Sequence, residues 1–177
     1  MSIRLENGDL FAVECDALAH GVNTKGVMGG IAGAFNQKYP ESSDFYQAMC
    51  KVDGLRPGEN YNDYENGKFI LHVVSQDQPG ADASEERLLL GLVGAVRDLI
   101  VDTQAENREE KIVVAMPLIG CGIGGLNFMD FFNVLLSVAF MFNNYVDFVV
   151  VYNDTNAHMI PDNLKYQTEV DTTVPAL

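Results

Sequence analysis

Apolar positions along the chain form short unbroken runs, of which the clearest are Lys68–Val74, Lys111–Met116 and Asp147–Tyr152. Runs of this length, rich in valine and isoleucine, are typical of strands that are buried on both faces of a sheet. Ile3–Leu5 and Ala17–His20 are shorter runs of the same kind. The pattern therefore predicts five strands, most of them in the core.

Between these strands, hydrophobic residues recur at the three- and four-residue spacing of amphipathic helices. Helices are predicted at Ile31–Tyr39, Pro40–Met49, Ser84–Thr103 and Asn127–Phe142. Residues 53–67 are expected to form turns, because Asp-Gly, Pro-Gly and Asn-Gly pairs interrupt them. Strands that alternate with helices predict an α/β fold whose largely parallel sheet is covered on both faces. Ligands of such sheets bind outside the carboxyl ends of the strands.

The length of 177 residues suits one domain, which we expect at residues 1–166. The segment 167–177 has little helical or strand character and is expected to be a loosely held tail. Phe128–Phe142 is the most apolar stretch, but it is short for a membrane span and contains Asp130, so we predict a buried helix and no membrane partner.

Charge and cysteine content narrow the class of function. The net charge is −14, which makes a broad nucleic-acid surface improbable, because lysine and arginine supply most of that affinity. A phosphate ligand would have to be held largely by backbone N–H groups. The three cysteines are an odd number without paired spacing, which predicts free thiols in a cytoplasmic protein and no structural metal.

Two glycine-rich loops follow predicted strands. The first runs from Gly21 to Gly30 and leads into a helix at Ile31, so Gly29 and Gly30 would offer the unpaired N–H donors of the first helical turn. The second, Pro117–Leu126, has four glycines within six residues and could wrap backbone donors around an anion as a nest. The first loop has neither the spacing of a P-loop nor that of a Rossmann fingerprint with its ribose-binding acid. A plain flexible connection is the alternative for each.

The order of these segments carries a family resemblance. Asn7-Gly8-Asp9-Leu10, then Asp16–Asn23, then Gly26–Ala32 and Pro117–Gly122 together resemble a macro domain, the module that binds ADP-ribose. The "AHGVNTKGVMGG-IA" and "MPLIGCG" segments resemble the branch with terminal ADP-ribose glycohydrolases and ADP-ribose 1″-phosphate phosphatases. The resemblance covers about Ile3 to Asn153 and implies a three-layer α/β/α fold with a mixed, largely parallel sheet, and no cofactor.

The resemblance also implies roles for individual residues. Asp9 would accept a hydrogen bond from the adenine amino group beside the Leu10 backbone, and Asn153 would flank the adenine. Asn23 would touch the distal ribose. The diphosphate would be lined by Gly29, Gly30 and Ile31 on one wall, and on the opposite wall by the backbone of Gly120, Cys121, Gly122, Ile123 and Gly124. The other expected ligand-binding positions are Lys25, Met28 and Ile119. For Asp9, a carboxylate that only caps its own turn is the alternative.

Two positions depart from the glycohydrolase pattern. Gln76 stands where that branch has a lysine that attacks the distal ribose, and an amide cannot form a Schiff base. Gly124 stands where that branch has an acid. The remaining candidates for catalysis are His20 and Asn23, with His20 as an acid or base or as a histidine held at a strand end. Lys25 could neutralise a terminal phosphate or be solvated, and Cys121 could be a small packing residue.

Three functions remain open from the sequence. The leading hypothesis is hydrolysis of an ADP-ribose derivative, most plausibly removal of the terminal phosphate of ADP-ribose 1″-phosphate. The second is a non-catalytic reader of ADP-ribose or a related nucleotide. The third is removal of ADP-ribose from acidic side chains by activated water, with an ADP-ribosylated protein as partner.

Overall fold

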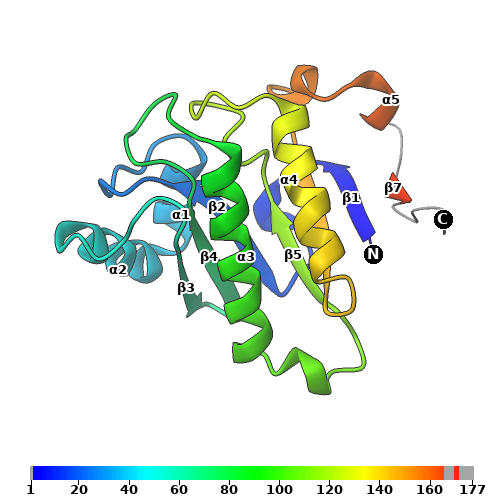
Figure 1. The fold of residues 1–177 in the computed structure, drawn as a ribbon, viewed down its shortest axis with the longest axis horizontal. Helices are drawn as coiled ribbons and strands as arrows, with labels where there is room; N and C mark the ends of the chain where they lie inside the picture. The colour runs from blue at the N-terminus through cyan, green and yellow to red at the C-terminus, as the bar shows by residue number, and fades with distance from the viewer. Residues whose placement is uncertain (1, 166–169, 172–177) are drawn as a thin grey trace.

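The fold is known from a computed structural model of the 177-residue chain, which describes residues 2–165 and 170–171 (Figure 1). Seven strands form one sheet in the order β3-β4-β2-β5-β6-β1-β7. The strands are β1 (Ser2–Asn7), β2 (Ala17–Val22), β3 (Asn60–Glu65), β4 (Lys68–Val74), β5 (Ile112–Met116), β6 (Val146–Tyr152) and β7 (Val170–Asp171). The helices are α1 (Ile31–Lys38), α2 (Pro40–Lys51), α3 (Glu85–Asp102), α4 (Phe128–Met141) and α5 (Asp162–Lys165).

The sheet is mixed but mostly parallel, as the alternation of strands and helices predicted. The five central strands β4, β2, β5, β6 and β1 pair in parallel, and β3 and β7 close the two edges in antiparallel orientation. The carboxyl ends of all five parallel strands therefore lie at the same edge of the sheet.

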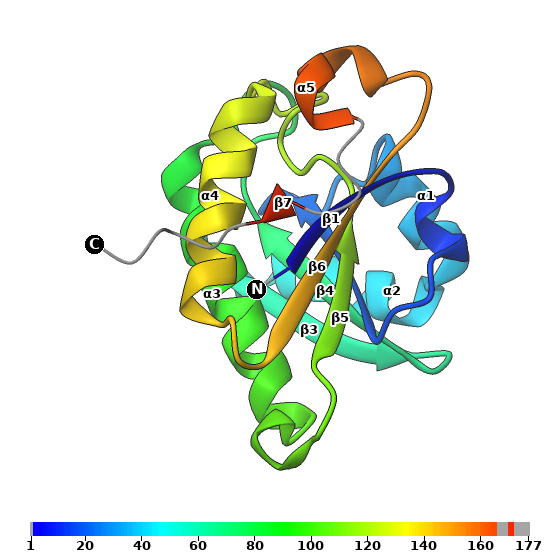
Figure 2. The ribbon, with the colours of Figure 1, turned by 90° about the vertical axis from the view of Figure 1, so that its right-hand side faces the viewer.

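Helices cover both faces of the sheet, which gives the predicted three layers. Figure 2 shows α3 and α4 on one face and α1 and α2 on the other. The larger core cluster lies under α3 and α4, and two smaller clusters lie under α1 and α2. Phe131 and Leu135 of α4 are fully buried, so the apolar segment is a core helix. Among the described residues, no helix is long and apolar enough to cross a membrane.

Helix starts are set by side chains that the sequence already marked. The Ser84 hydroxyl accepts a hydrogen bond from the Arg87 N–H and caps α3. Asn127 and Asp130 form a reciprocal capping box at the start of α4. By contrast, Gly30 precedes α1 and provides no side-chain cap.

One strand was not predicted. Residues 53–67 were expected to be turns, but β3 occupies Asn60–Glu65 and pairs with β4 through a hairpin at Asn66-Gly67. Both hairpin residues have positive φ, +52° and +80°, as two-residue hairpin turns require. The strand escaped prediction because it is an edge strand of mostly polar and half-buried residues, without the apolar run that marks a core strand.

The predicted tail at 167–177 is described only at Val170–Asp171, where β7 pairs with β1. The other tail residues lie outside the described part of the chain, as does residue 166 at the predicted end of the domain.

Candidate functional site

A cavity of about 770 Å³ opens at the carboxyl ends of the parallel strands. This volume is within the range of small-molecule sites, and the position is where open α/β sheets bind ligands. It is lined by Asn7, Gly8, Asp9, Leu10, Gly21, Gly29, Gly30, Ile31, Ala34, Gln76, Pro117, Leu118, Ile119, Gly120, Gly122, Ile123, Gly124, Val151, Tyr152, Asn153, Asp154, Asn156 and Met159.

The first glycine-rich loop supplies one wall of the cavity. Gly30 has φ +56° and ψ −128° and is the residue immediately before α1. The N–H groups of Gly29, Gly30 and Ile31 have no acceptor among the described residues. Because the helix dipole adds positive potential at its N-terminus, these three donors form half of an anion site.

The second loop supplies the facing wall. It is folded by its own turns, in which Cys121 N–H donates to Leu118 O at 3.1 Å and Leu126 N–H donates to Gly120 O at 2.9 Å. These turns leave the N–H groups of Gly120, Gly122, Ile123 and Gly124 without an acceptor among the described residues. Successive free N–H groups of this kind make an anion-binding concavity.

The two walls approach each other across the mouth of the cavity. A Cβ at Gly30 would lie 3.6 Å from Cδ1 of Ile123, whose side chain is 66% exposed. Gly124 leaves no room for a side chain, since a Cβ there would be 2.7 Å from Gly120 O and 3.0 Å from Ala83 Cβ. The glycohydrolase pattern expects an acid at position 124. In this fold Gly124 has no space for an acidic side chain.

At the β6–β1 end, Asp9 caps the short helix η1 (Leu10–Ala12). Its Oδ1 accepts a hydrogen bond from the Phe11 N–H at 3.0 Å, so one carboxylate oxygen belongs to the turn. No described residue donates to Oδ2 of Asp9, and Asp9 lines the cavity. The capping role and a ligand contact are therefore compatible for this carboxylate.

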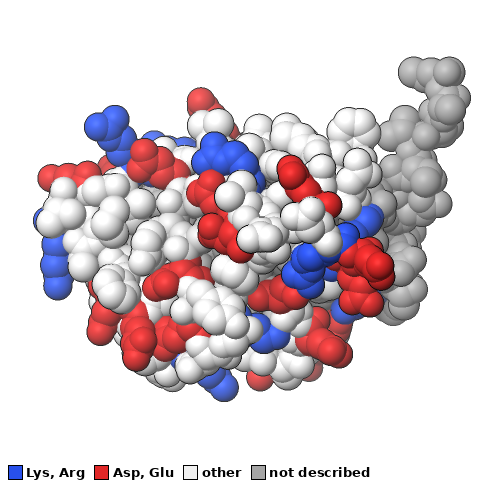
Figure 3. Space-filling view, turned by 90° about the horizontal axis from the view of Figure 1, so that it is seen from below, with Lys and Arg blue, Asp and Glu red and all other residues white. Residues whose placement is uncertain are grey.

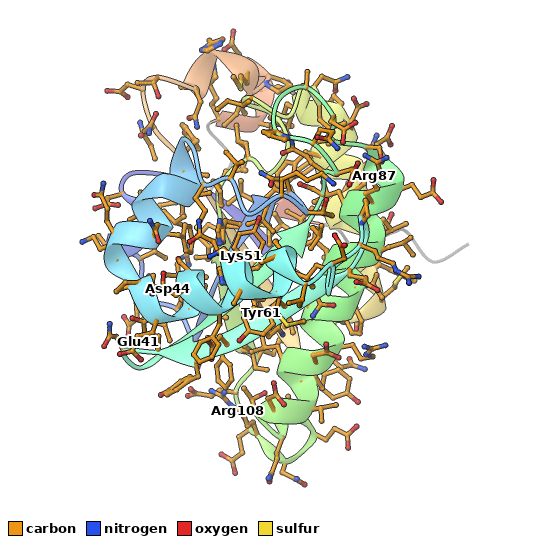
Figure 4. All side chains as sticks on the ribbon, turned by 90° about the vertical axis from the view of Figure 1, so that its left-hand side faces the viewer. Glu41, Asp44, Lys51, Tyr61, Arg87 and Arg108 are labelled. Atoms are coloured by element: carbon orange, nitrogen blue, oxygen red, sulfur yellow. The ribbon has the colours of Figure 1, made fainter. Side chains whose placement is uncertain are left out.

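At the β2–β4 end, the cavity is lined by Gly21 and Gln76. Just outside it, Lys25 pairs with Asp77 at 3.3 Å, and Arg87 pairs with Asp82 at 2.9 Å. Figure 4 shows Arg87 near the start of α3. Hydrogen bonds from the Thr24 hydroxyl, Gln78 and Lys25 lower the pKa of Asp77 to about 2. These charges neutralise one another and do not line the cavity.

His20 lies in the core, so its assignment as a catalytic acid or base is corrected. The side chain is fully buried, stacks on Phe35 at 3.9 Å between ring centroids, and shares a hydrogen bond of 2.8 Å between its Nε2 and Nδ1 of His72. Burial, and then the neighbouring His72, lower the pKa of His20 well below 6.5, so it stays neutral. Side chains alternate across a strand, and the next residue, Gly21, is the one that lines the cavity.

Asn23 is not among the described residues that line the cavity. Its Oδ1 accepts from the N–H groups of Lys25 at 2.9 Å and Val27 at 3.2 Å, and its Nδ2 donates to Val27 O at 2.8 Å. All of these bonds stay within the first loop. Asn23 thus shapes the loop that presents the Gly29–Ile31 donors, and its predicted ribose contact stays a prediction.

Three further residues that were predicted to contact a ligand are not among the described residues that line the cavity. Lys25 is committed to Asp77, and Met28 packs against the two smaller core clusters. Cys121 is buried, and its thiol donates to Asn127 O at 3.5 Å. Burial raises the pKa of this thiol to about 12, so it is an uncharged packing group.

The structure brings the other predicted residues together around one cavity. They are Asp9, Leu10, Gly29, Gly30, Ile31, Ile119, Gly120, Gly122, Ile123, Gly124 and Asn153. Lining residues that sequence reasoning missed include Asn7, Asp154, Asn156 and Met159. Asn7 Nδ2 donates to Asp154 Oδ1 at 3.3 Å, and this contact joins residues that are 147 positions apart. No local pattern could reveal it.

No group of three or more His, Cys, Asp or Glu side chains within the described part of the chain could hold a metal ion.

The fold and the cavity define an α/β protein with a backbone-lined anion cleft at the carboxyl edge of its sheet. The Macro domain family model matches residues 19–135, more than half of the chain, and the chain belongs to the macro domain family.

Curated relatives carry the names of two hydrolases. The DNA ADP-ribosyl glycohydrolase of Mycobacterium tuberculosis is 31% identical over 130 residues, which are 70% of this chain and 35% of that protein. The ADP-ribose 1″-phosphate phosphatase of Candida albicans is 26% identical over 148 residues, which are 72% of this chain and 88% of that protein. The chain thus spans about a third of the length of the glycohydrolases that it matches.

Solved structures agree with the fold. The macrodomain of Mycobacterium tuberculosis DarG has a TM-score of 0.72 and 29% sequence identity, and the match covers 84% of this chain and 96% of that one. Thermosipho africanus DarTG, solved in complex with ADP-ribose, has a TM-score of 0.65 and 23% identity, over 93% of this chain and 46% of that one.

Proposed function

We propose that the cavity binds ADP-ribose or a derivative of it, and that backbone N–H groups hold the diphosphate. The observation that carries this proposal is the pair of facing loops, whose seven N–H groups, three from one and four from the other, have no acceptor among the described residues. Unpaired N–H donors at a cavity are costly unless water or an anion satisfies them. The names of the relatives, which contain ADP-ribose, support the same ligand.

The sheet order suggests the direction of the ligand. Asp9 and Asn153 stand at the β6–β1 end and offer a carboxylate and a polar rim for adenine, as the resemblance implied. Gln76 stands at the opposite end, at β4, and would face the terminal ribose. Four strand spacings of about 4.8 Å, about 19 Å in all, separate β4 from β1, and residues that follow both strands line the cavity. This separation suits an extended nucleotide sugar.

A nucleic-acid partner is not part of this proposal, although the names of several relatives include DNA. The chain carries a net charge of −14, and lysine and arginine supply most of the affinity for nucleic acid. On the one face that Figure 3 shows, seen from below, acidic and basic side chains are interspersed. A small nucleotide or an ADP-ribosylated protein is the partner that we propose. All three cysteines of the chain are free thiols, which favours the cytoplasm as the location of this protein.

Calorimetric titration with ADP-ribose tests the proposal. Saturable binding in the micromolar range is expected, with adenosine binding more weakly because it has no diphosphate. A titration without heat at several temperatures, with the protein shown to be folded by circular dichroism, would contradict it.

Hydrolysis of a bond at the terminal ribose is the second candidate. It is favoured by the two relatives of 31% and 26% identity that are named as hydrolases. Among the described lining residues, the only carboxylates are Asp9 and Asp154, at the opposite end from Gln76, and none is Lys, Arg or His. Hydrolysis would then rely on a water positioned by backbone groups and the Gln76 amide, and we expect it to be slow.

One incubation series separates hydrolysis from binding alone. The chain is incubated with ADP-ribose 1″-phosphate, a glutamate-ADP-ribosylated protein and an ADP-ribosylated DNA oligonucleotide, and the products are separated by chromatography. Released phosphate indicates a phosphatase, and released ADP-ribose a glycohydrolase. No product above the buffer blank refutes hydrolysis and leaves a non-catalytic reader.

A further inference from the structure

The side-chain amide of Gln76 is held in one orientation at the β2–β4 end of the cavity. Its Nε2 donates to Gly80 O at 2.5 Å and to Gln78 O at 3.2 Å. Only the NH₂ group of an amide can donate to two carbonyls, so a flipped amide would place two acceptors against its oxygen. Oε1 therefore lies on the other edge of the amide, and no described residue donates to it.

The segment that fixes this amide is itself braced. Oδ2 of Asp82 accepts from the N–H groups of Asp77 at 2.8 Å and Gln78 at 3.0 Å, and from Nη1 of Arg87 at 2.9 Å. These bonds close the turn that contains the Gly80 carbonyl. A side chain that is ordered before the ligand arrives loses little entropy on binding, so its acceptor is preorganised.

The same segment is docked on the second glycine-rich loop. The Ala83 N–H donates to Gly124 O at 3.1 Å, and a Cβ at Gly125 would lie only 3.1 Å from Ala81 Cβ. The position of Gln76 is thus tied to the wall that carries the anion donors.

The charges around this end favour a neutral group. No Lys, Arg or His is among the described residues that line the cavity, and the nearby Lys25 and Arg87 are each paired with an aspartate. A phosphate monoester presents only acceptor oxygens and about two negative charges, so a fixed carbonyl acceptor repels it. A ribose hydroxyl can donate to that same acceptor.

We propose that Gln76 determines specificity at the terminal end of the cavity, where it selects an ADP-ribose with a free or glycosidically linked terminal ribose over one esterified by phosphate. The inference rests on the proposed binding of ADP-ribose. Gln76 is the position where the family resemblance expects a lysine, and the amide replaces a cationic donor with a neutral acceptor.

Calorimetry with ADP-ribose, ADP-ribose 1″-phosphate and ADP tests this selection. The natural chain is expected to bind ADP-ribose at least about tenfold more tightly than the 1″-phosphate. Gln76→Ala should weaken the binding of ADP-ribose by about fivefold, which is the effect of one hydrogen bond. It should leave the binding of ADP unchanged, because ADP does not reach this end of the cavity. Gln76→Lys should reverse the preference between ADP-ribose and its 1″-phosphate.

Gln78→Ala is the matched control, because it removes a neighbouring amide that is exposed and does not line the cavity. It should leave all three affinities unchanged. Equal or tighter binding of the 1″-phosphate by the natural chain, or an equal loss for ADP and ADP-ribose in Gln76→Ala, would overturn the selection. Failure of all three ligands to bind the folded natural chain would instead refute the proposed function.

Discussion

Gly30 is the position where the anion site depends most directly on backbone geometry. Its φ of +56° with ψ of −128° lies in a region that side chains with a Cβ rarely adopt, and Gly30 precedes α1 without providing a side-chain cap. We predict that Gly30→Ala destabilises the fold and weakens the nucleotide site together. Gly29→Ala is the matched control for stability, since a Cβ at Gly29 meets nothing within 4 Å and its φ is not in the positive range.

The size of the effect follows from the surroundings. A Cβ at Gly30 would lie 3.6 Å from Cδ1 of Ile123, which is ordinary contact, so the cost comes from the backbone. Holding a non-glycine residue in such a region costs roughly 1–3 kcal/mol. For a domain of this size, each kcal/mol lowers Tm by about 2–4 °C, so a decrease of about 2–12 °C is expected. If the backbone relaxes instead, the Gly30 and Ile31 donors turn, and losing one charge-assisted hydrogen bond weakens binding by about tenfold or more.

Thermal unfolding followed by circular dichroism measures the first effect, and calorimetry with ADP-ribose measures the second. The natural chain, Gly29→Ala and Gly30→Ala are compared under one set of conditions. A Tm decrease of the same size in both variants would show that the loop tolerates no methyl at all. An unchanged Tm together with an unchanged ADP-ribose affinity in Gly30→Ala would show that its positive φ carries no strain. Either result refutes the reasoning.

Three further predictions concern single side chains. Asp9→Ala should weaken the binding of ADP-ribose, measured by calorimetry, by about tenfold, because a carboxylate oxygen that accepts a hydrogen bond from the adenine amino group is lost. Asn23→Ala should lower the free energy of unfolding in urea by about 2–3 kcal/mol, because three hydrogen bonds within the first loop disappear. Burial lowers the pKa of His72 from 6.5 to about 3 and that of His20 in the same direction, so the unfolded chain binds more protons below pH 6.5. Stability should therefore fall as the pH falls, by about 2 kcal/mol from His72 between pH 6.5 and 5.0, with a further loss in the same direction from His20.

Each of these predictions has its own control. The hypoxanthine analogue of ADP-ribose has no amino group, so Asp9→Ala should change the affinity for this analogue little. An equal loss of affinity for the analogue and for ADP-ribose contradicts the adenine contact. An Asn23→Ala variant of unchanged stability would show that the loop does not need its amide. For the pH effect, the control is His158→Gln, which changes an exposed histidine. In urea titrations, the free energy of unfolding of this variant should depend on pH as it does in the natural chain. If the free energy of unfolding of the natural chain does not change between pH 6.5 and 5.0, the neutral burial of His20 and His72 is contradicted.

Much of the fold was predictable because it rests on local physics. Unbroken apolar runs marked β4, β5 and β6, and helical spacing with recognisable starts marked the four long helices. The strand β3 was not predictable in this way, because its residues are mostly polar and half-buried and its pairing with β4 stabilises it. The glycine-rich loops were also visible, since a conformation with positive φ requires residues such as Gly30 and Gly120.

By itself, the sequence determined that the chain is an α/β domain with two glycine-rich loops at strand ends, because periodicity and glycine content are local properties. Only the tertiary structure decided which side chains reach the cavity. His20 and Gly21 are neighbours in a strand whose residues are almost all buried, and only the packing of α1 decides that the imidazole lies against Phe35. Similarly, Gln76 became a fixed acceptor only through the carbonyls of the turn that follows it. The faces of a strand and the partners of an amide depend on contacts between segments, which a local pattern does not encode.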